Sequence, residues 1–231
     1  MDFESFVLAA ATADLREEPA ARDHADAVEF RMDMAEKPLT ALAEYDGELP
    51  IIATNRVEWE GGNAPDEEAR TDALCTAVEH DAVEAIDVEL KAILEEDAAY
   101  VVNYAHDNGA DVIVSTHDFE RTPEPPKLRQ LLDQAAKHGD VGKLAVTAES
   151  ADDVLELLAA TRASDAAGDR VATMAMGEAG RHSRAVAPVY GSKIGYAPVE
   201  PESATAPGQY DLATLRRLVT DLASGEGGPG E

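Results

Sequence analysis

A lysine and a histidine on neighbouring apolar segments are the residues of this 231-residue sequence best suited to chemistry. Lys143 begins the apolar run 143–147, and His117 follows the run 112–116. A lysine that points into a barrel or cleft loses solvation, so its pKa falls and its amine can become a nucleophile near neutral pH. A nearby histidine could then move protons for the carbonyl that the lysine captures. The strand pattern by itself favours a simpler interpretation, in which Lys143 extends from a strand end into solvent.

Charged side chains alternate along the segment 28–33. Glu29, Arg31 and Asp33 are spaced two residues apart, so an extended chain presents all three on one face. One interpretation is an amphipathic strand with a solvated polar face. In a barrel, however, one face looks into the core and the other is covered by helices, so three charges of mixed sign predict a buried network.

The next two strand-like segments also end in charged residues. Arg56 follows the run 51–54, and a guanidinium suits a fixed, planar contact with an oxygen-rich ligand. Glu60 comes directly before a Gly-Gly pair that frees the backbone. Asp87 and Glu89 share one face of the following segment, and the pattern leaves open whether they line a site or serve the fold.

These residues need a scaffold that brings strand ends together. Short apolar runs alternate with acidic, alanine-rich stretches of helical character along nearly the whole chain. The predicted strands are 6–11, 27–32, 50–54, 82–88, 111–116, 143–147, 170–174 and 192–196, and the predicted helices lie near 13–23, 36–46, 65–79, 90–107, 125–138, 150–163, 178–188 and 209–223. Eight βα repeats favour an α/β fold closed as a (β/α)8 TIM barrel over an open doubly wound sheet, although strand order is not written in the pattern. We expect one barrel domain over residues 1–223 and a disordered acidic, glycine-rich tail at 224–231.

The overall charge excludes some partners. The formal net charge is −28, which would repel nucleic acid and anionic membranes. The carboxylates are spread along the chain and resemble the surface of a protein from a salt-rich cytoplasm. The single cysteine, Cys75, excludes an internal disulfide, and no apolar run approaches the roughly 20 residues that span a bilayer. Without a signal-peptide pattern, the expected location is the cytoplasm.

The segments with chemical potential also fit together as a set. They read Glu29-Phe30-Arg31-Met32-Asp33, Arg56-x3-Glu60-Gly61-Gly62, Ser115-Thr116-His117-Asp118-Phe119, Lys143, Met174-Ala175-Met176-Gly177-x2-Gly180-x2-Ser183-Arg184 and Ala206-Pro207-Gly208-Gln209. In this order, from residue 29 to residue 209, they resemble the type I 3-dehydroquinate dehydratases. The resemblance implies a hydro-lyase, commonly a homodimeric TIM barrel, that converts 3-dehydroquinate to 3-dehydroshikimate in the shikimate pathway of aromatic amino acid biosynthesis. It implies no metal and no organic cofactor.

Motif position also implies residue roles. Lys143 would form a Schiff base with the substrate, His117 would transfer protons and Glu60 would support His117. The expected substrate-binding residues are Glu29, Arg31, Arg56, Met174, Met176, Arg184, Tyr196, Thr205 and Gln209.

The sequence departs from the family pattern at three positions. Thr205 stands where the family usually has serine, Tyr196 where it usually has phenylalanine, and Phe30 where tryptophan is common. The segment 198–208 has a composition that permits a mobile lid, although the sequence does not establish whether it closes.

Two other functions compete with this interpretation. A class I aldolase acting on a phosphorylated sugar would also form an imine, but it would need a phosphate cradle after the last two strands. A barrel that only binds or regulates would not need an intact set of Lys143, His117 and Glu60.

Overall fold

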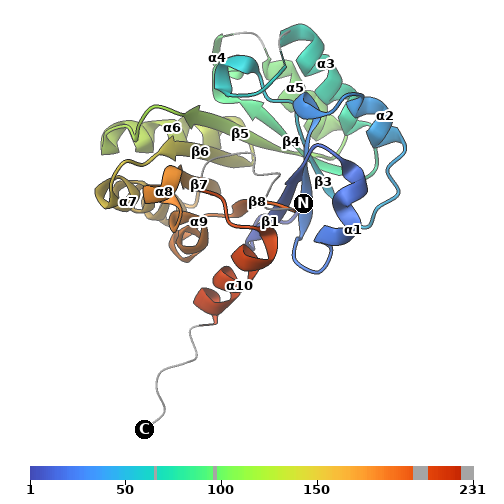
Figure 1. The fold of residues 1–231 in the computed structure, drawn as a ribbon. Coiled ribbons are helices and arrows are strands. Elements are labelled where there is room, and N and C mark those ends of the chain that lie inside the picture. Colours follow the sequence, from blue (N-terminus) through green and yellow to red (C-terminus); the bar gives the residue numbers. More distant parts are fainter. Residues whose placement is uncertain (65–66, 96–97, 200–207, 225–231) are drawn as a thin grey trace.

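The structure is a computed structural model that describes residues 1–64, 67–95, 98–199 and 208–224. Parallel strands form one eight-stranded sheet in which the first seven strands pair in sequence order, and the first strand also pairs with the last (Figure 1). The strands are β1 (Val7–Thr12), β2 (Ala27–Arg31), β3 (Ile51–Thr54), β4 (Val83–Glu89), β5 (Asp111–Asp118), β6 (Val141–Thr147), β7 (Val171–Met176) and β8 (Ile194–Pro198). The predicted single-domain (β/α)8 TIM barrel is confirmed.

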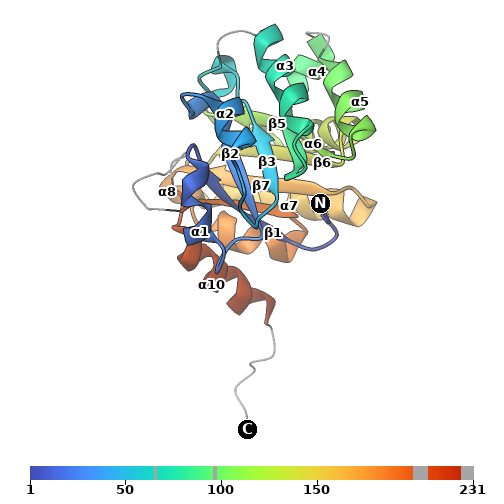
Figure 2. The ribbon, with the colours of Figure 1, turned by 90° about the vertical axis from the view of Figure 1, so that its right-hand side faces the viewer.

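Helices connect the strands and cover the outside of the sheet (Figures 1 and 2). The α-helices are α1 (Glu18–Ala21), α2 (Pro38–Ala43), α3 (Glu67–Val78), α4 (Leu90–Glu95), α5 (Ala99–Asp107), α6 (Pro125–His138), α7 (Ala151–Ala167), α8 (Gly177–Gly180), α9 (Ser183–Val186) and α10 (Leu212–Ala223). Short 3₁₀ helices are η1 (Leu15–Glu17), η2 (Met32–Met34), η3 (Glu58–Glu60) and η4 (Ala187–Tyr190).

Three predicted helices are divided, and the one expected over 13–23 consists of η1 followed directly by α1. The helix expected over 90–107 consists of α4 and α5, and the one expected over 178–188 consists of α8, α9 and η4. In the segment 178–188 the backbone lies close against β7. The approach is so close that a Cβ on Gly180 would lie 2.6 Å from the carbonyl oxygen of Ala175. Pro188 lies within η4, where its missing N–H does not disturb a first turn.

Strand alternation separates two apolar layers. In β6, Leu144 and Val146 point outward and pack with the buried residues of α6 and α7. Val141 and Ala145 point inward and belong to a second cluster that fills the barrel. Lys143 has the same parity as these two residues, so it also points inward. Near the strand starts, the buried Phe3 joins the interior cluster beside Val7 and closes that end of the barrel.

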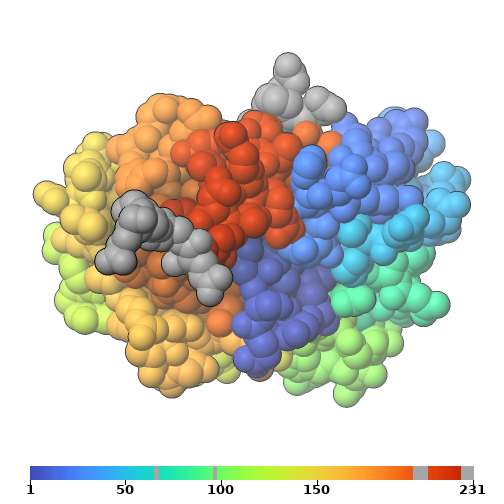
Figure 3. Space-filling view, turned by 90° about the horizontal axis from the view of Figure 1, so that it is seen from below, coloured from blue at the N-terminus to red at the C-terminus, as the bar shows by residue number. Residues whose placement is uncertain are grey.

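The last helix links the two ends of the chain. Leu212, Leu215 and Val219 of α10 pack in one cluster with Leu8 of β1 and Ala21 of α1. In the space-filling view α10 lies between the segments of the first and last repeats (Figure 3).

The barrel has one side without a backbone ladder. Within the described residues, the only bridge on this side joins Val171 of β7 to Ser192, which precedes β8, and there the Lys193 N–H donates to the Val171 carbonyl. Further along β7, serine side chains take the place of a partner strand. The N–H of Thr173 donates to Ser192 Oγ (3.0 Å) and the N–H of Ala175 donates to Ser183 Oγ (2.9 Å).

Candidate active site

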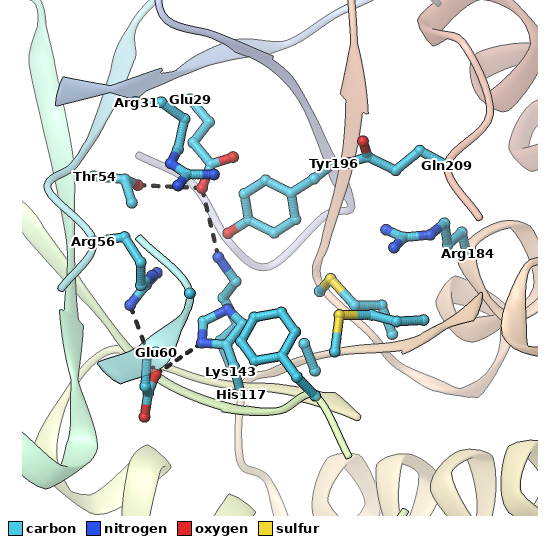
Figure 4. Close-up of a pocket in the computed structure, with 15 residues that line it drawn as sticks. Glu29, Arg31, Thr54, Arg56, Glu60, His117, Lys143, Arg184, Tyr196 and Gln209 are labelled. Carbon is cyan, nitrogen blue, oxygen red and sulfur yellow. Dashed lines mark hydrogen bonds and ion pairs between the residues drawn. The ribbon is translucent and has the colours of Figure 1, made fainter. Parts of the chain in front are cut away.

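A pocket opens at the carboxyl ends of the strands, where TIM barrels carry their chemistry. All the predicted site residues within the described ranges line it, and Figure 4 shows them around one space. Thr205, also predicted for the site, lies outside the described residues, as do residues 200–207 of the predicted lid and residues 225–231 of the predicted tail.

Lys143 is held inside the barrel by charge. Its side chain is 4% exposed, and Nζ donates to Asp87 Oδ2 at 2.8 Å. Glu29 Oε1 lies 3.6 Å from Nζ, and the centre of the Tyr196 ring lies 4.0 Å away. The strand begins at Val141, two residues earlier than expected, which places Lys143 within the strand. The interpretation of a lysine that extends into solvent is therefore wrong.

His117 forms a buried pair with Glu60. His117 Nδ1 and Glu60 Oε2 are 2.8 Å apart, and the ring of Phe119 stacks on the imidazole with 5.9 Å between ring centres. Burial, together with the charges of Arg56 and Lys143, lowers the pKa of His117 well below its ordinary value. Burial raises the pKa of Glu60 to about 8, although Arg56 opposes the shift. When Glu60 is ionised, Nδ1–H donates to it and Nε2 keeps its lone pair, which is the arrangement that a proton-accepting histidine needs.

Arg56 lines the pocket and belongs to a buried group that we call the floor cluster, together with Arg70, Asp87, Glu89 and Ser115. Asp87 Oδ1 accepts from Arg56 Nη2 (2.6 Å) and from Ser115 Oγ (2.6 Å). Glu89 accepts from Arg56 Nη1 (2.6 Å) and pairs with Arg70 Nη1 (2.6 Å). Asp87 and Glu89 are fully buried below the lining, so they support the site and do not line it. Burial opposes ionisation of Asp87, but Arg56 and Lys143 outweigh it and hold the pKa of Asp87 well below its usual range.

Among the carboxylates around Lys143, Glu60 holds a proton most readily. Its pKa is raised, chiefly by burial, while Arg56 and Lys143 keep Asp87 ionised.

The expected network around Glu29, Arg31 and Asp33 is present with a different geometry. Glu29 accepts from Thr54 Oγ1 (3.2 Å) and lines the pocket with Arg31. Asp33 does not continue the alternation, because β2 ends at Arg31 and η2 begins at Met32. The chain turns back there, and the Asp33 carboxylate accepts two hydrogen bonds from the Arg31 guanidinium, at 2.9 and 2.8 Å. The side chain of Asp33 thus fixes Arg31 and does not line the pocket.

The opposite wall combines a cation with apolar side chains. Met174 and Met176 of β7 and Tyr196 of β8 are buried, and Arg184 of α9 lies near Gln209 (Figure 4). Burial lowers the pKa of Arg184 to about 10, so the guanidinium still carries its charge at neutral pH.

The position of Gln209 depends on the residue before it. Gly208 has φ +76°, and a Cβ there would lie 2.5 Å from the carbonyl oxygen of Gly177. Only glycine fits this close approach, which sets where Gln209 enters the pocket.

Comparisons with known proteins agree with this geometry. Residues 6–225 match the family model of the type I 3-dehydroquinases. The chain belongs to this family. It is 62% identical to a 3-dehydroquinate dehydratase of Haloarcula marismortui, over 97% of this chain and 99% of that protein. It is 50% identical to the corresponding protein of Halobacterium salinarum, over 96% of this chain and all of that protein. Both relatives come from halophilic archaea, in keeping with the acidic composition of this chain.

Solved structures give the same family. A crystal structure of a 3-dehydroquinate dehydratase from Geobacillus kaustophilus matches with a TM-score of 0.85 at 28% identity, covering 96% of this chain and 93% of that one. A type I enzyme from Clostridium difficile, solved with covalently modified comenic acid, matches with a TM-score of 0.84 at 26% identity, covering 95% and 93%. Membership of the type I 3-dehydroquinase family excludes the alternative of a class I aldolase.

The pocket of this member of the type I 3-dehydroquinase family also contains residues to which the sequence analysis assigned no role in the site. The lining also includes Thr54, Gly61, Phe119 and Ala145. Thr54 ends β3 and pairs with Asp87 of β4 in the strand register. Its alternation along β3 could therefore have predicted that its side chain points into the barrel. Phe119 is about half exposed beyond the end of β5, and nothing in its local pattern indicated a stack on His117.

The described part of the chain lacks the features of two other classes of protein. None of its helices combines the length and the apolar character of a membrane span. In the same part of the chain, no group of three or more His, Cys, Asp or Glu side chains is arranged to hold a metal ion.

Proposed function

We propose that this protein dehydrates 3-dehydroquinate to 3-dehydroshikimate through a Schiff base on Lys143. The observation that carries the proposal is the arrangement of Lys143. Its Nζ lies inside the pocket, bonded to Asp87 and near Glu29, and the His117–Glu60 pair lines the same space. A buried amine beside a proton-transfer pair is the equipment for imine chemistry at a ketone.

The first step joins the lysine to the substrate. Nζ is paired with the carboxylates of Asp87 and Glu29, so it must give up a proton to a neighbouring base before it attacks. The neutral amine then bonds to C3 of the substrate and loses a second proton, and these two protons leave with the carbonyl oxygen as water. The product is a protonated imine, which draws electrons from the neighbouring carbon and makes the proton on C2 far more acidic.

The second step uses His117 twice. With Glu60 ionised and accepting from Nδ1–H, Nε2 of His117 takes the proton from C2 and leaves an enamine. The enamine then expels the hydroxyl group on C1, and His117 returns its proton so that the group leaves as water. Because one residue removes the proton and protonates the leaving group, both depart from the same face of the ring, a syn elimination. Water hydrolyses the imine, again with His117, and frees Lys143.

The walls of the pocket match the two ends of the substrate. Arg184 and Gln209 lie where they can bind its carboxylate, and a guanidinium is well suited to that contact. On the other side Glu29, Arg31 and Arg56 can bind its hydroxyl groups. Met174, Met176 and Tyr196 supply an apolar wall for the ring, and Thr205 is assigned to the site by motif position alone.

We further propose that the protein acts in the cytoplasm as a homodimer, as the family resemblance implies. Its partners would be its own second copy and the small-molecule substrate, without nucleic acid or membrane. Light scattering coupled to gel filtration in molar KCl tests the dimer directly, and a mass of one chain across the working concentration range would contradict it.

Borohydride trapping tests the chemistry. The protein is mixed with 3-dehydroquinate and sodium borohydride, and the intact mass and peptide masses are measured. With borohydride, we expect one reduced adduct on Lys143. Without borohydride, we expect formation of the conjugated product, which is followed by its ultraviolet absorbance. Lys143→Ala should lose both, with turnover lower by several orders of magnitude.

Lys137→Ala is the matched control, because Lys137 is an exposed lysine on α6 that pairs with Asp133. It should keep adduct formation and turnover. A folded wild-type protein that forms no adduct at Lys143 would refute the proposed function.

A further inference from the structure

Tyr196 carries a polar group that the fold does not use. Its side chain is 4% exposed, and its hydroxyl oxygen is buried without a hydrogen-bond partner in the described part of the structure. The hydroxyl end of the ring points into the pocket, toward the space between Lys143 and Glu29 (Figure 4). The hydroxyl therefore lies where a bound molecule would meet it.

The fold alone gives no reason for this hydroxyl. Removing a hydroxyl from water without replacing its hydrogen bond destabilises the folded state, whereas a phenylalanine ring of the same shape would not carry that cost. Tyr45 shows how a structural tyrosine behaves in the same protein, since its hydroxyl donates to the carbonyl oxygen of Leu49 at 2.6 Å. Buried tyrosine hydroxyls usually have such a partner. The partner missing for Tyr196 is therefore expected to come from the substrate.

We propose that the Tyr196 hydroxyl donates a hydrogen bond to the substrate oxygen on the carbon that Lys143 attacks. This inference rests on the proposed function. The attacked carbon must come within bonding distance of Nζ, and its oxygen is one bond further. The Tyr196 ring is centred 4.0 Å from Nζ, and its hydroxyl points into the same space, so the oxygen on that carbon is within its reach.

The electrostatics of the pocket keep Tyr196 a donor. Burial, with Glu29 and Asp87 nearby, raises the pKa of Tyr196 well above its ordinary value, so the hydroxyl keeps its proton throughout the working range of pH. As Nζ attacks, negative charge develops on the carbonyl oxygen, and a fixed donor stabilises that charge. No proton passes from Tyr196 to the substrate. The oxygen leaves as water with protons from other groups, and during hydrolysis the same hydroxyl holds the incoming water at this carbon.

The Tyr196→Phe variant separates this role from a structural one, with Tyr45→Phe as the matched control. For each protein we would measure stability to urea at fixed molar KCl, kcat/KM for 3-dehydroquinate, and the single-turnover rate of the borohydride-trapped adduct. Tyr196→Phe should unfold at an equal or higher urea concentration, because it removes a buried group without a partner. Its kcat/KM and its adduct rate should both fall, roughly 5- to 100-fold. Tyr45→Phe should do the opposite, with lower stability and unchanged kcat/KM.

The outcomes are distinguishable. If the wild type turns over 3-dehydroquinate and Tyr196→Phe matches it in kcat/KM and adduct rate, the inference is wrong and the proposed function stands. If Tyr196→Phe is less stable than the wild type, the hydroxyl serves the fold and the inference is also wrong. A folded wild type that neither turns over nor traps 3-dehydroquinate would overturn the proposed function and this inference together.

Discussion

Replacing Glu60 with glutamine should make the protein more stable while it loses activity. The carboxyl group of Glu60 is 7% exposed, and its pKa is raised from 4.5 to about 8, chiefly by burial. Between these two pH values the folded protein holds a proton on Glu60 that the unfolded chain has released. The free energy of unfolding of the wild type therefore falls as the pH rises through this window. Glutamine has nearly the same shape and carries no charge, so Glu60→Gln should escape this decline.

The size of the effect follows from the shift. One pKa unit corresponds to about 1.4 kcal/mol, so the full shift sets an upper value of about 5 kcal/mol for the gain above pH ~8. Partial rearrangement around Arg56 and His117 will lower it, and we expect roughly 2–4 kcal/mol. The gain should be small near pH ~5, increase through the window and then level off. Turnover should drop, because a neutral amide stabilises a protonated His117 less than a carboxylate does.

Urea unfolding at constant molar KCl, repeated across this range of pH, measures the gain. Glu58→Gln provides the control, because Glu58 lies exposed in the same short helix, η3. It should show no pH-dependent gain. A stability difference between Glu60→Gln and the wild type that stays flat with pH, or reverses sign in alkali, would refute the reasoning about the buried charge.

Three further results are expected. Asp87→Asn removes the carboxylate that contacts both Arg56 and Lys143, and loss of this buried charge pairing should lower the free energy of unfolding in urea by about 3–5 kcal/mol. The variant should also form the borohydride-trapped adduct more slowly. An unchanged trapping rate in a folded variant would argue that Asp87 does not position Lys143. Gly208→Ala should raise KM for 3-dehydroquinate more than it lowers kcat, because its Cβ would push against the Gly177 carbonyl and move Gln209; unchanged steady-state kinetics would contradict this. Salt should assist catalysis, since screening within about 3 Å at 1 M weakens repulsion between the −28 protein and an anionic substrate; a steady rise in kcat/KM as KCl is removed from folded protein would contradict that expectation.

Sequence reasoning located the scaffold because barrel strands have a strong local signal. Each predicted strand overlaps an observed one, and most boundaries shift by one or two residues. The wrong helix predictions concern segments whose conformation depends on packing against neighbouring elements. The segment after β7 breaks into short pieces because Gly180 and Ser183 pack against the strand, which no helical period reveals.

The environment of Lys143 could not be read from its own segment. Its nearest partner, Asp87, lies 56 positions earlier in the chain and meets it across the barrel interior. The sequence indicated only that Asp87 and Glu89 share one face of their strand. Likewise, the pairing of Asp33 with Arg31 depends on where β2 ends, and a strict alternation cannot predict that a turn begins at Met32. Local patterns thus predicted which face of a strand each side chain takes. The partners of these side chains come from contacts between residues distant in sequence, which local patterns do not reveal.

The missing ladder between β7 and β8 divides the pocket into a stiff half and a compliant half. Lys143 and His117 stand on β6 and β5, which are joined by continuous backbone pairing to each other and to β4. Met174 and Tyr196 stand on opposite sides of the open seam, where one backbone bridge, serine hydroxyls and side-chain packing hold the strands. Because no backbone ladder spans the seam, we expect the width of the pocket to be adjusted on this side. Variation in substrate range should therefore arise at the seam, and the reacting groups should keep their spacing.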